Sequence, residues 1–314
     1  MLISIVVPTY RRPDSLRALL RGLSVQSFEG AFEVVVVDDD GGGLQQVVEP
    51  FQTHLNLKLL SQPNSGPAQA RNLGARHATG LRLVFLDDDC VPEAHCLQRI
   101  AEAHDEYPDA AIGGLTRNLL TDNIYSSASQ LLLDFLYGHF QEEGPRADRF
   151  FTTNNLSVPR RRFLAIGGFD TGFSMAAGED RELSDRWRFH AGELVFDPRI
   201  VVGHAHPLAL RSFIRQHLRY GTAAKRYWRL KRLRERGRPR LKSKHFYSRL
   251  VCYPVIRFGL SLKAGALASL FALSQVANAL GYLAAPEPDL DTRPRVEPSG
   301  PIGRAVRDGP SEGV

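Results

Sequence analysis

The chain has 314 residues, of which 43% are hydrophobic and 24% charged, and its formal net charge is +6. This composition allows one large α/β domain or two smaller ones with a sizeable core, and it excludes a disordered or fibrous protein. The three cysteines, Cys90, Cys96 and Cys252, form no C-x-x-C pair, so neither a disulfide scaffold nor a zinc module is expected and a reducing compartment fits best.

Strand and helix signals alternate over the first part of the chain. Continuous apolar runs, rather than alternating ones, predict a parallel sheet that is covered on both faces. The predicted strands are Ile3–Val7, Phe32–Val37, Leu55–Leu60 and Leu83–Leu86, and the predicted helices are Asp14–Leu23 and Ala68–His77.

The pattern is less regular after Ala110. We expect strands at Ala111–Gly114 and Asn154–Val158, and helices at Ser129–Phe140, from Arg181 to about His190, and at Leu208–Leu233. Residues 264–285 carry no charge, and residues 286–314 hold six prolines with no periodicity, which predicts a disordered tail.

Three consecutive aspartates, Asp87, Asp88 and Asp89, follow the apolar run Leu83–Leu86. An isolated aspartate pair at a strand end is usually a helix cap or a solvated turn, but a cap needs one carboxylate and not three. Carboxylates this close repel one another unless a cation holds them together. The cluster therefore predicts a divalent-metal site, with Mg²⁺ or Mn²⁺ as the cofactor.

A second acidic pair, Glu179 and Asp180, follows Gly178 and directly precedes the helix predicted from Arg181. A carboxylate at the end of a glycine-bearing loop can be aimed into a cleft, so this pair is a candidate for a general base. Both acidic clusters lie outside regular strands, and in open α/β sheets ligands bind at the carboxyl ends of strands.

Taken together, these residues resemble the family 2 glycosyltransferases of GT-A fold. Each motif alone is weak, but their order and spacing cover roughly residues 1 to 205. The matching pieces are Val6–Tyr10, Val37–Asp39, Asn64 with Gly66, Ala70–Gly74, Leu86–Asp89 with Pro92, Gly167–Asp170, and Glu179 with Asp180.

The resemblance implies a single Rossmann-like, mostly parallel sheet flanked by helices. It implies a catalytic domain at residues 1–205, a basic and apolar helical extension at 206–285, and the tail at 286–314. The implied activity is transfer of a sugar, with inversion, from a nucleotide-diphosphate sugar to an acceptor hydroxyl. By family habit the donor is a UDP- or dTDP-sugar, and the acceptor is a glycan or lipid-linked molecule of cell-surface synthesis.

The resemblance also assigns roles to individual residues. Asp38 and Asp39 would hold the nucleotide base and ribose, Asp87 and Asp89 the metal that bridges the two phosphates, and Asp180 would be the catalytic base. Further contacts to the nucleotide sugar are expected from Pro8, Thr9, Tyr10, Arg12, Asn64, Gly66, Arg71 and Asp88, and contacts on the acceptor side from Glu179 and Asn155.

Two histidines, His204 and His206, follow the predicted base helix. In enzymes of this fold a histidine at such a position can complete the metal shell, and a neutral imidazole is a competent ligand. The alternative is a pair of histidines that stabilise a strand end or face water. The sequence does not choose between these roles, or between the two residues.

The chemistry of sugar transfer supports these roles independently of the resemblance. The diphosphate leaving group needs its growing charge neutralised, which a bound cation does as a Lewis acid. The acceptor oxygen needs a base within hydrogen-bond reach. One carboxylate base without a carboxylate nucleophile favours a single displacement with inversion.

Two other function classes fit parts of the sequence. A sugar-phosphate nucleotidyltransferase would share the metal and the fold, but it usually opens with a glycine-rich loop, and Thr9–Pro13 contains no glycine. A non-catalytic basic protein on the same fold would bind a membrane rather than nucleic acid, because the acidic clusters would repel a nucleic-acid backbone.

The charge distribution predicts a membrane partner. Between Arg211 and Arg249 there are fifteen Lys/Arg and one acid, Glu235, so this segment carries +14 and the rest of the chain −8. The uncharged run 264–285 is long enough to span a bilayer, but it is rich in Ala, Gly and Ser. A helix in the membrane interface, or a hairpin packed on the catalytic domain, fits as well. The N-terminus lacks the features of a signal peptide, so we expect a cytoplasmic protein at the inner face of the plasma membrane.

Overall fold

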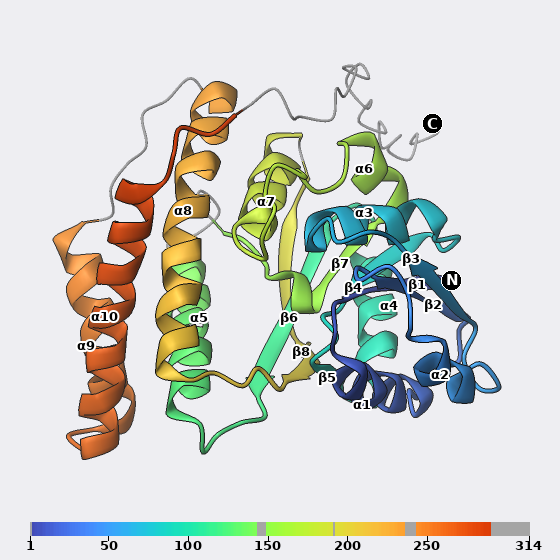
Figure 1. Ribbon diagram of the computed structural model, residues 1–314, viewed down its shortest axis with the longest axis horizontal. Coiled ribbons are helices and arrows are strands. Elements are labelled where there is room, and N and C mark those ends of the chain that lie inside the picture. The colour runs from blue at the N-terminus through green and yellow to red at the C-terminus, as the bar shows by residue number, and fades with distance from the viewer. Residues whose placement is uncertain (1, 143–148, 191, 236–242, 290–314) are drawn as a thin grey trace, which may run out of the picture.

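The computed structural model describes residues 2–142, 149–190, 192–235 and 243–289, and Figure 1 shows its elements around one eight-stranded sheet. The strand order is β3-β2-β1-β4-β7-β6-β8-β5. The strands are β1 (Ile3–Thr9), β2 (Phe32–Asp38), β3 (Leu57–Ser61), β4 (Arg82–Phe85), β5 (Cys90–Pro92), β6 (Ala111–Asn118), β7 (Leu156–Pro159) and β8 (Leu194–His204).

The helices connect and cover these strands. They are α1 (Pro13–Ser24), α2 (Gln45–Val48), α3 (Pro67–His77), α4 (Cys96–Glu106), α5 (Ile124–Glu142), α6 (Arg160–Ala165), α7 (Glu179–Phe189), α8 (Leu210–Glu235), α9 (Lys244–Phe258) and α10 (Leu262–Ala284), with short 3₁₀ turns η1 (Glu49–Phe51) and η2 (Thr153–Asn155).

The half of the sheet built from β1, β2, β3 and β4 is parallel, as the apolar runs predict. Strand β1 pairs in parallel with β2 and β4, and β2 pairs in parallel with β3. The register places Thr9 opposite Asp38 at the carboxyl edge. The other half is mixed: β7 is antiparallel to β4 and β6, β8 is parallel to β6, and β5 is antiparallel to β8. The α/β fold class is confirmed, with one half of the sheet wholly parallel and the other half mixed.

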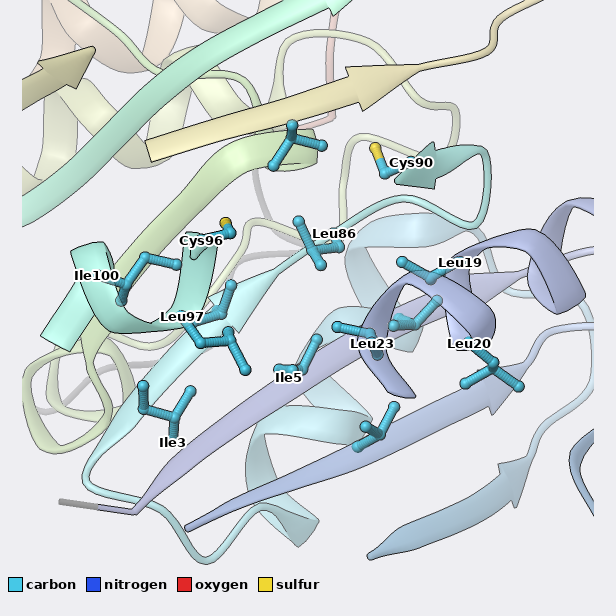
Figure 2. Packing of buried hydrophobic residues seen from close by; sticks show 14 of the residues in the cluster. Ile3, Ile5, Leu19, Leu20, Leu23, Leu86, Cys90, Cys96, Leu97 and Ile100 are labelled. Carbon is cyan, nitrogen blue, oxygen red and sulfur yellow. The ribbon is translucent and has the colours of Figure 1, made fainter. Parts of the chain in front are cut away.

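Each face of the sheet has its own core. Helices α1 and α4 pack on one face, where Leu19 and Leu23 of α1 and Leu97 of α4 meet Ile3 and Ile5 of β1 (Figure 2). On the other face α3, α6 and α7 cover β1 and β4 through a second apolar cluster. Residues of β1 alternate between the two clusters, with Val6 in the second, so one buried strand supplies both cores.

Helices α5, α8, α9 and α10 form a separate helical layer beside the sheet (Figure 1), with a core of its own. Phe135 of α5, Phe213 of α8, Phe246 of α9 and Phe271 of α10 all belong to this core. Because α5 precedes residue 205, the expected boundary at 205 does not separate two cores.

The sequence located most elements but missed several. Helix α4, strand β8 and helix α9 were not predicted, and α5 begins at Ile124, before the expected Ser129. Residues 286–289 of the expected tail run back along α8, where the Lys225 ammonium donates to the Ala285 carbonyl and pairs with Glu287. The rest of the expected tail, residues 290–314, lies outside the described residues.

The contact between α8 and α10 gives a stability prediction. A Cβ on Gly281 would lie 2.0 Å from the Leu218 carbonyl oxygen, whereas a Cβ on Gly265 of the same helix would meet nothing within 4 Å. We expect Gly281→Ala to lower the free energy of unfolding by about 1–3 kcal/mol, because the two helix backbones must separate. Gly265→Ala should be neutral or stabilising by up to about 1 kcal/mol, since alanine is the better helix former.

Urea unfolding followed by circular dichroism measures both variants. Equal stability of the two alanine variants would contradict the close approach of α8 and α10.

Candidate active site

The last aspartate of the cluster, Asp89, is contacted by both histidines. His204 Nε2 lies 3.0 Å from Asp89 Oδ1, and His206 Nδ1 lies 3.3 Å from Asp89 Oδ2. The two imidazole rings stack, with centroids 5.4 Å apart and planes within 5° of parallel. Strand pairing produces this arrangement, because Cys90 of β5 lies opposite His204 of β8 and the Ala205 amide donates to the Asp89 carbonyl.

His204 and His206 shift the pKa of Asp89, and Asp89 shifts the pKa of His204. Burial acts to raise the pKa of Asp89, but hydrogen bonds and charge from His204 and His206 outweigh it and lower the pKa well below its usual range. For His204 burial acts to lower the pKa, and the Asp89 carboxylate outweighs it and raises the pKa. The three side chains thus form one electrostatic unit.

The donor set at Asp89 fits a divalent cation. One carboxylate and two imidazoles lie close together here. Asp89 Oδ1 is buried and has no hydrogen bond of regular geometry, because it only lies within ion-pair distance of His204. The ligand atoms of Asp89, Cys90 and His204 lie within 4.8 Å of one another, a group that does not include His206. The buried Cys90 thiol contacts the Asn154 carbonyl, and burial raises its pKa well above the usual range, so it stays protonated. Asp89 and His204 are thus the ligands that this group offers to a cation, and His206 lies at the other oxygen of Asp89.

A glutamine that the sequence analysis did not select fixes the second histidine. Gln216 of α8 lies with its Oε1 3.1 Å from His206 Nε2, and its Nε2 lies 3.0 Å from both Ser129 Oγ and Tyr220 Oη. The helical layer thereby orients a side chain of the predicted metal group. No local sequence signal points to Gln216, since it lies within a basic helix far from the motifs.

The middle aspartate, Asp88, follows β4 and contacts the end of β1 and the loop after it. It accepts a hydrogen bond from Thr9 Oγ1 at 2.8 Å, and Arg12 Nη1 lies 3.2 Å from its Oδ1 and 3.0 Å from Asp89 Oδ2. Burial raises the pKa of Asp88 to about 6, against the opposing charge of Arg12. The half-exposed Arg12 guanidinium thus stands as a cation over two carboxylates at the rim of the site.

The backbone of this loop is strained. Arg11 has φ of +56°, the one described non-glycine residue at positive φ, and its guanidinium pairs with Asp40 and lies over the Tyr10 ring. Such outliers are typical of functional loops. Tyr10 is exposed beside Arg12, whereas Pro8 is buried inside β1.

The first aspartate, Asp87, is joined to the second acidic cluster by a buried arginine. Arg71 of α3 is 2% exposed, and it donates from Nη2 to Asp87 Oδ1 at 2.6 Å and from Nη1 to Glu179 Oε1 at 3.0 Å. Asp87 is therefore held by Arg71 and lies outside the group formed at Asp89. Arg71 is a link between the acidic clusters and not a solvated surface charge.

The base candidate begins helix α7. Gly178 has φ of +83° and precedes Glu179, and Asp180 Oδ1 accepts from the Arg181 amide at 2.7 Å. Glu179 is 3% exposed, while Asp180 is half-buried. Burial raises the pKa of both carboxyls, and the nearby Arg71 charge acts in the opposite direction.

The two aspartates after β2 differ in what they contact. Both oxygens of Asp39 accept from the loop before α3, from Gln62 Nε2, the Ser65 amide and the Gly66 amide, at 2.7 to 2.9 Å. Asp38 Oδ1 accepts from the Asp40 amide, while its Oδ2 is buried without a described hydrogen bond. Asp38 therefore keeps an oxygen for a ligand, and Asp39 organises the loop.

Three other residues expected at the site, Gly66, Asn64 and Asn155, differ in their surroundings. Gly66 has φ of +87° and lies under the Ser174 carbonyl, so it brings two loops together. Asn64 is exposed in the same loop. Asn155 is buried, and its amide donates to the carbonyls of Leu115 and Ile200. The Asn155 amide nitrogen is thus engaged within the sheet, and a contact with the acceptor stays a prediction.

Comparison with known proteins assigns the sequence to a family. The sequence model of "Glycosyl transferase family 2" matches residues 4–178. Validoxylamine A glucosyltransferase of Streptomyces hygroscopicus subsp. limoneus is 30% identical over 219 residues, which are 60% of this chain and 48% of that protein. The chain thus spans about half the length of this relative.

Two solved structures share the fold. The mannosyltransferase PcManGT from Pyrobaculum calidifontis, in complex with GDP-Man and Mn²⁺, superposes with a TM-score of 0.61 at 20% identity, over 90% of this chain and 87% of the other. TarS of Staphylococcus aureus in complex with UDP gives 0.54 at 18% identity, over 90% and 89%. The GT-A fold is confirmed.

The Arg71 link gives a prediction that needs no substrate. We expect Arg71→Met to lower the free energy of unfolding by about 3 kcal/mol at neutral pH, because it leaves buried carboxylates without their cation. The loss should shrink as the pH falls, since a protonated Glu179 no longer needs the partner. Arg76→Met, at an exposed position of the same helix, is the control.

Denaturant titrations of both variants at neutral and acidic pH provide the measurement. A loss that is the same for both variants, or that grows in acid, would show that Arg71 does not compensate buried carboxylates.

Proposed function

Because this chain belongs to glycosyl transferase family 2, we propose that it transfers a sugar from a nucleotide-diphosphate sugar to an acceptor hydroxyl with inversion. The observation that carries the proposal is the convergence of two clusters at the carboxyl edge of the sheet. Asp89 with its two histidines forms one cluster, Glu179 with Asp180 forms the other, and Arg71 joins them through Asp87.

The donor would lie along the carboxyl ends of β1, β2 and β4. The buried Asp38 oxygen suits a donor group of the base or ribose, and Arg12 offers a cation at the rim for the diphosphate. Neighbours of the same fold are complexes with GDP-Man and with UDP, which supports a nucleotide-sugar donor. A UDP- or dTDP-sugar remains our proposal for the nucleotide.

Asp89, His204 and His206 would hold Mg²⁺ or Mn²⁺, because both imidazoles contact the Asp89 carboxylate. A neighbour of the same fold is a complex with Mn²⁺, which supports a divalent cation in this fold. When bound, the cation supplies charge neutralisation for the diphosphate leaving group. The residues of the chain do the rest: Gln216 orients His206, and Thr9 and Arg12 fix Asp88.

Asp180 would take the proton from the acceptor hydroxyl. Glu179 is engaged with Arg71. Asp180 is half-buried, and its Oδ2 accepts no hydrogen bond from the residues that the structure describes. A pKa raised by burial makes a carboxylate a stronger base, provided that it is deprotonated at the working pH. A single base favours direct displacement, with a glycan or lipid-linked molecule of cell-surface synthesis as acceptor.

The metal group can be tested with an isosteric change. Asp89→Asn should weaken Mn²⁺ binding by roughly 100-fold and abolish most transfer, because it removes the one anionic ligand of the group. Titration calorimetry with Mn²⁺ and nucleotide, with and without a chelator, measures the first effect directly. Asp122→Asn, at an exposed position, is the matched control. An Mn²⁺ affinity equal to that of the control would remove Asp89 from the metal site.

The role of Asp180 as the base can be tested separately from donor binding. Asp180→Asn should lower turnover by about 10²-fold or more while nucleotide affinity stays nearly unchanged, since a general base acts in the chemical step. In the unchanged enzyme, activity should fall as the pH drops through the raised pKa of Asp180, at a pH above the usual range of an aspartate.

Asp14→Asn at the exposed start of α1 is the control for the charge change. If Asp180→Asn turned over as fast as this control, Glu179 would become the candidate base.

A further inference from the structure

Bulky apolar side chains are exposed at the turn between α9 and α10 and in the helix ends beside it. Leu260 and Leu262 are each 97% exposed, Ile256 is 69% exposed and Phe258 51% exposed. Together with the basic Arg257 and Lys263 these residues are here called the hairpin tip. The turn projects at the end of the helical layer where α5 and α8 begin (Figure 1).

The apolar character continues along the outer face of α10. Val276, Leu280 and Leu283 are more than half exposed, and the run 264–285 contains no charged residue. Over the described residues α10 is the one helix long and apolar enough to cross a membrane by length and composition, with a mean hydropathy of 1.4 and a third of the window buried. A soluble monomer rarely exposes so continuous an apolar surface.

The charged residues in the segment around this apolar surface are all positive. From Arg236 to Pro286 the sequence contains no Asp or Glu, and Arg257 and Lys263 flank the exposed leucines directly. A second copy of the chain would bring an equally positive tip to the contact. Anionic lipid instead offers both an apolar interior for the leucines and negative headgroups for the two cations.

The packing of α10 argues against a span. Its other face is buried on α8, where Gly221 and Gly281 allow the backbones to approach and Thr222 Oγ1 donates to the Gly281 carbonyl. Helix α8 carries Lys225 and Arg226 beside this contact, both engaged with protein partners. A spanning α10 would have to leave α8 and expose Leu267 and Phe271 of the shared core.

We propose that the hairpin tip inserts Leu260, Leu262 and Phe258 into the interface of an anionic lipid bilayer, while Arg257 and Lys263 contact the headgroups and α10 stays packed on α8. This docking does not depend on the transfer reaction, because it involves none of the residues placed in the active site.

Vesicle co-sedimentation of the full-length protein tests the docking in the absence of any sugar donor. We expect binding to vesicles of phosphatidylcholine with phosphatidylglycerol. The double variant Leu260→Ser with Leu262→Ser should lower the partition coefficient by about tenfold or more, because it removes the apolar insertion. Arg257→Gln with Lys263→Gln should weaken binding mainly at low salt, where headgroup attraction is unscreened.

The matched control is Val25→Ser with Leu81→Ser, which changes two exposed aliphatic side chains on the catalytic domain, 67% and 68% exposed. It should bind as the unchanged protein does. Leu260→Phe with Leu262→Phe keeps the tip apolar and should retain binding. Circular dichroism of each variant checks the fold.

Three results would overturn the proposal. The first is a tip variant that partitions like the control, and the second is full-length protein that stays in solution with anionic vesicles at low salt. The third is protein that resists alkaline carbonate extraction, which would mean a spanning helix. An environment-sensitive dye on Cys252, the exposed cysteine of α9, should brighten with anionic vesicles in the unchanged protein but not in the Leu260→Ser, Leu262→Ser variant.

Discussion

One buried guanidinium ties the site together. Arg71 contacts Asp87, 16 residues away in sequence, and Glu179, 108 residues away, and it is almost fully buried. The buried Glu179 carboxylate loses its hydration and the partly exposed Asp87 carboxylate repels it, so a shared cation is what lets the end of β4 and α7 meet here. Because Glu179 is engaged in this way, the adjacent Asp180 is the acid of the pair that remains available for chemistry.

The basic helix α8 is part of the scaffold of the site. Arg226 holds Asp170 with contacts of 3.0 to 3.1 Å, and Lys231 and Arg234 both pair with Asp185 of α7 at 2.7 to 2.8 Å. A Cβ on Gly172 would collide with the Arg226 guanidinium, so the loop before α7 is shaped around this ion pair. These charges are engaged inside the protein and are not free to attract a membrane.

The sequence by itself determined the sheet edge where the site lies. Apolar runs such as Phe32–Val37 can be buried on both faces only in a covered parallel sheet, and the polar residues that end them must then share one edge. The Asp87–Asp89 cluster follows from this argument, whereas the roles of Asp38 and Thr9 rest on the family resemblance; the register places Thr9 opposite Asp38 at the same edge. The helix predicted from Arg181 begins two residues earlier, at Glu179, directly after Gly178 with its positive φ.

Only the tertiary structure decided which partners these residues have. The pairing of β8 with β5 brought both His204 and His206 to Asp89, and no spacing in the sequence encodes that pairing. A count of charges could not distinguish Arg71, buried between two acids, from an arginine in solvent. These outcomes depend on contacts between residues far apart in the chain, whereas local periodicity reports only which face of an element is buried.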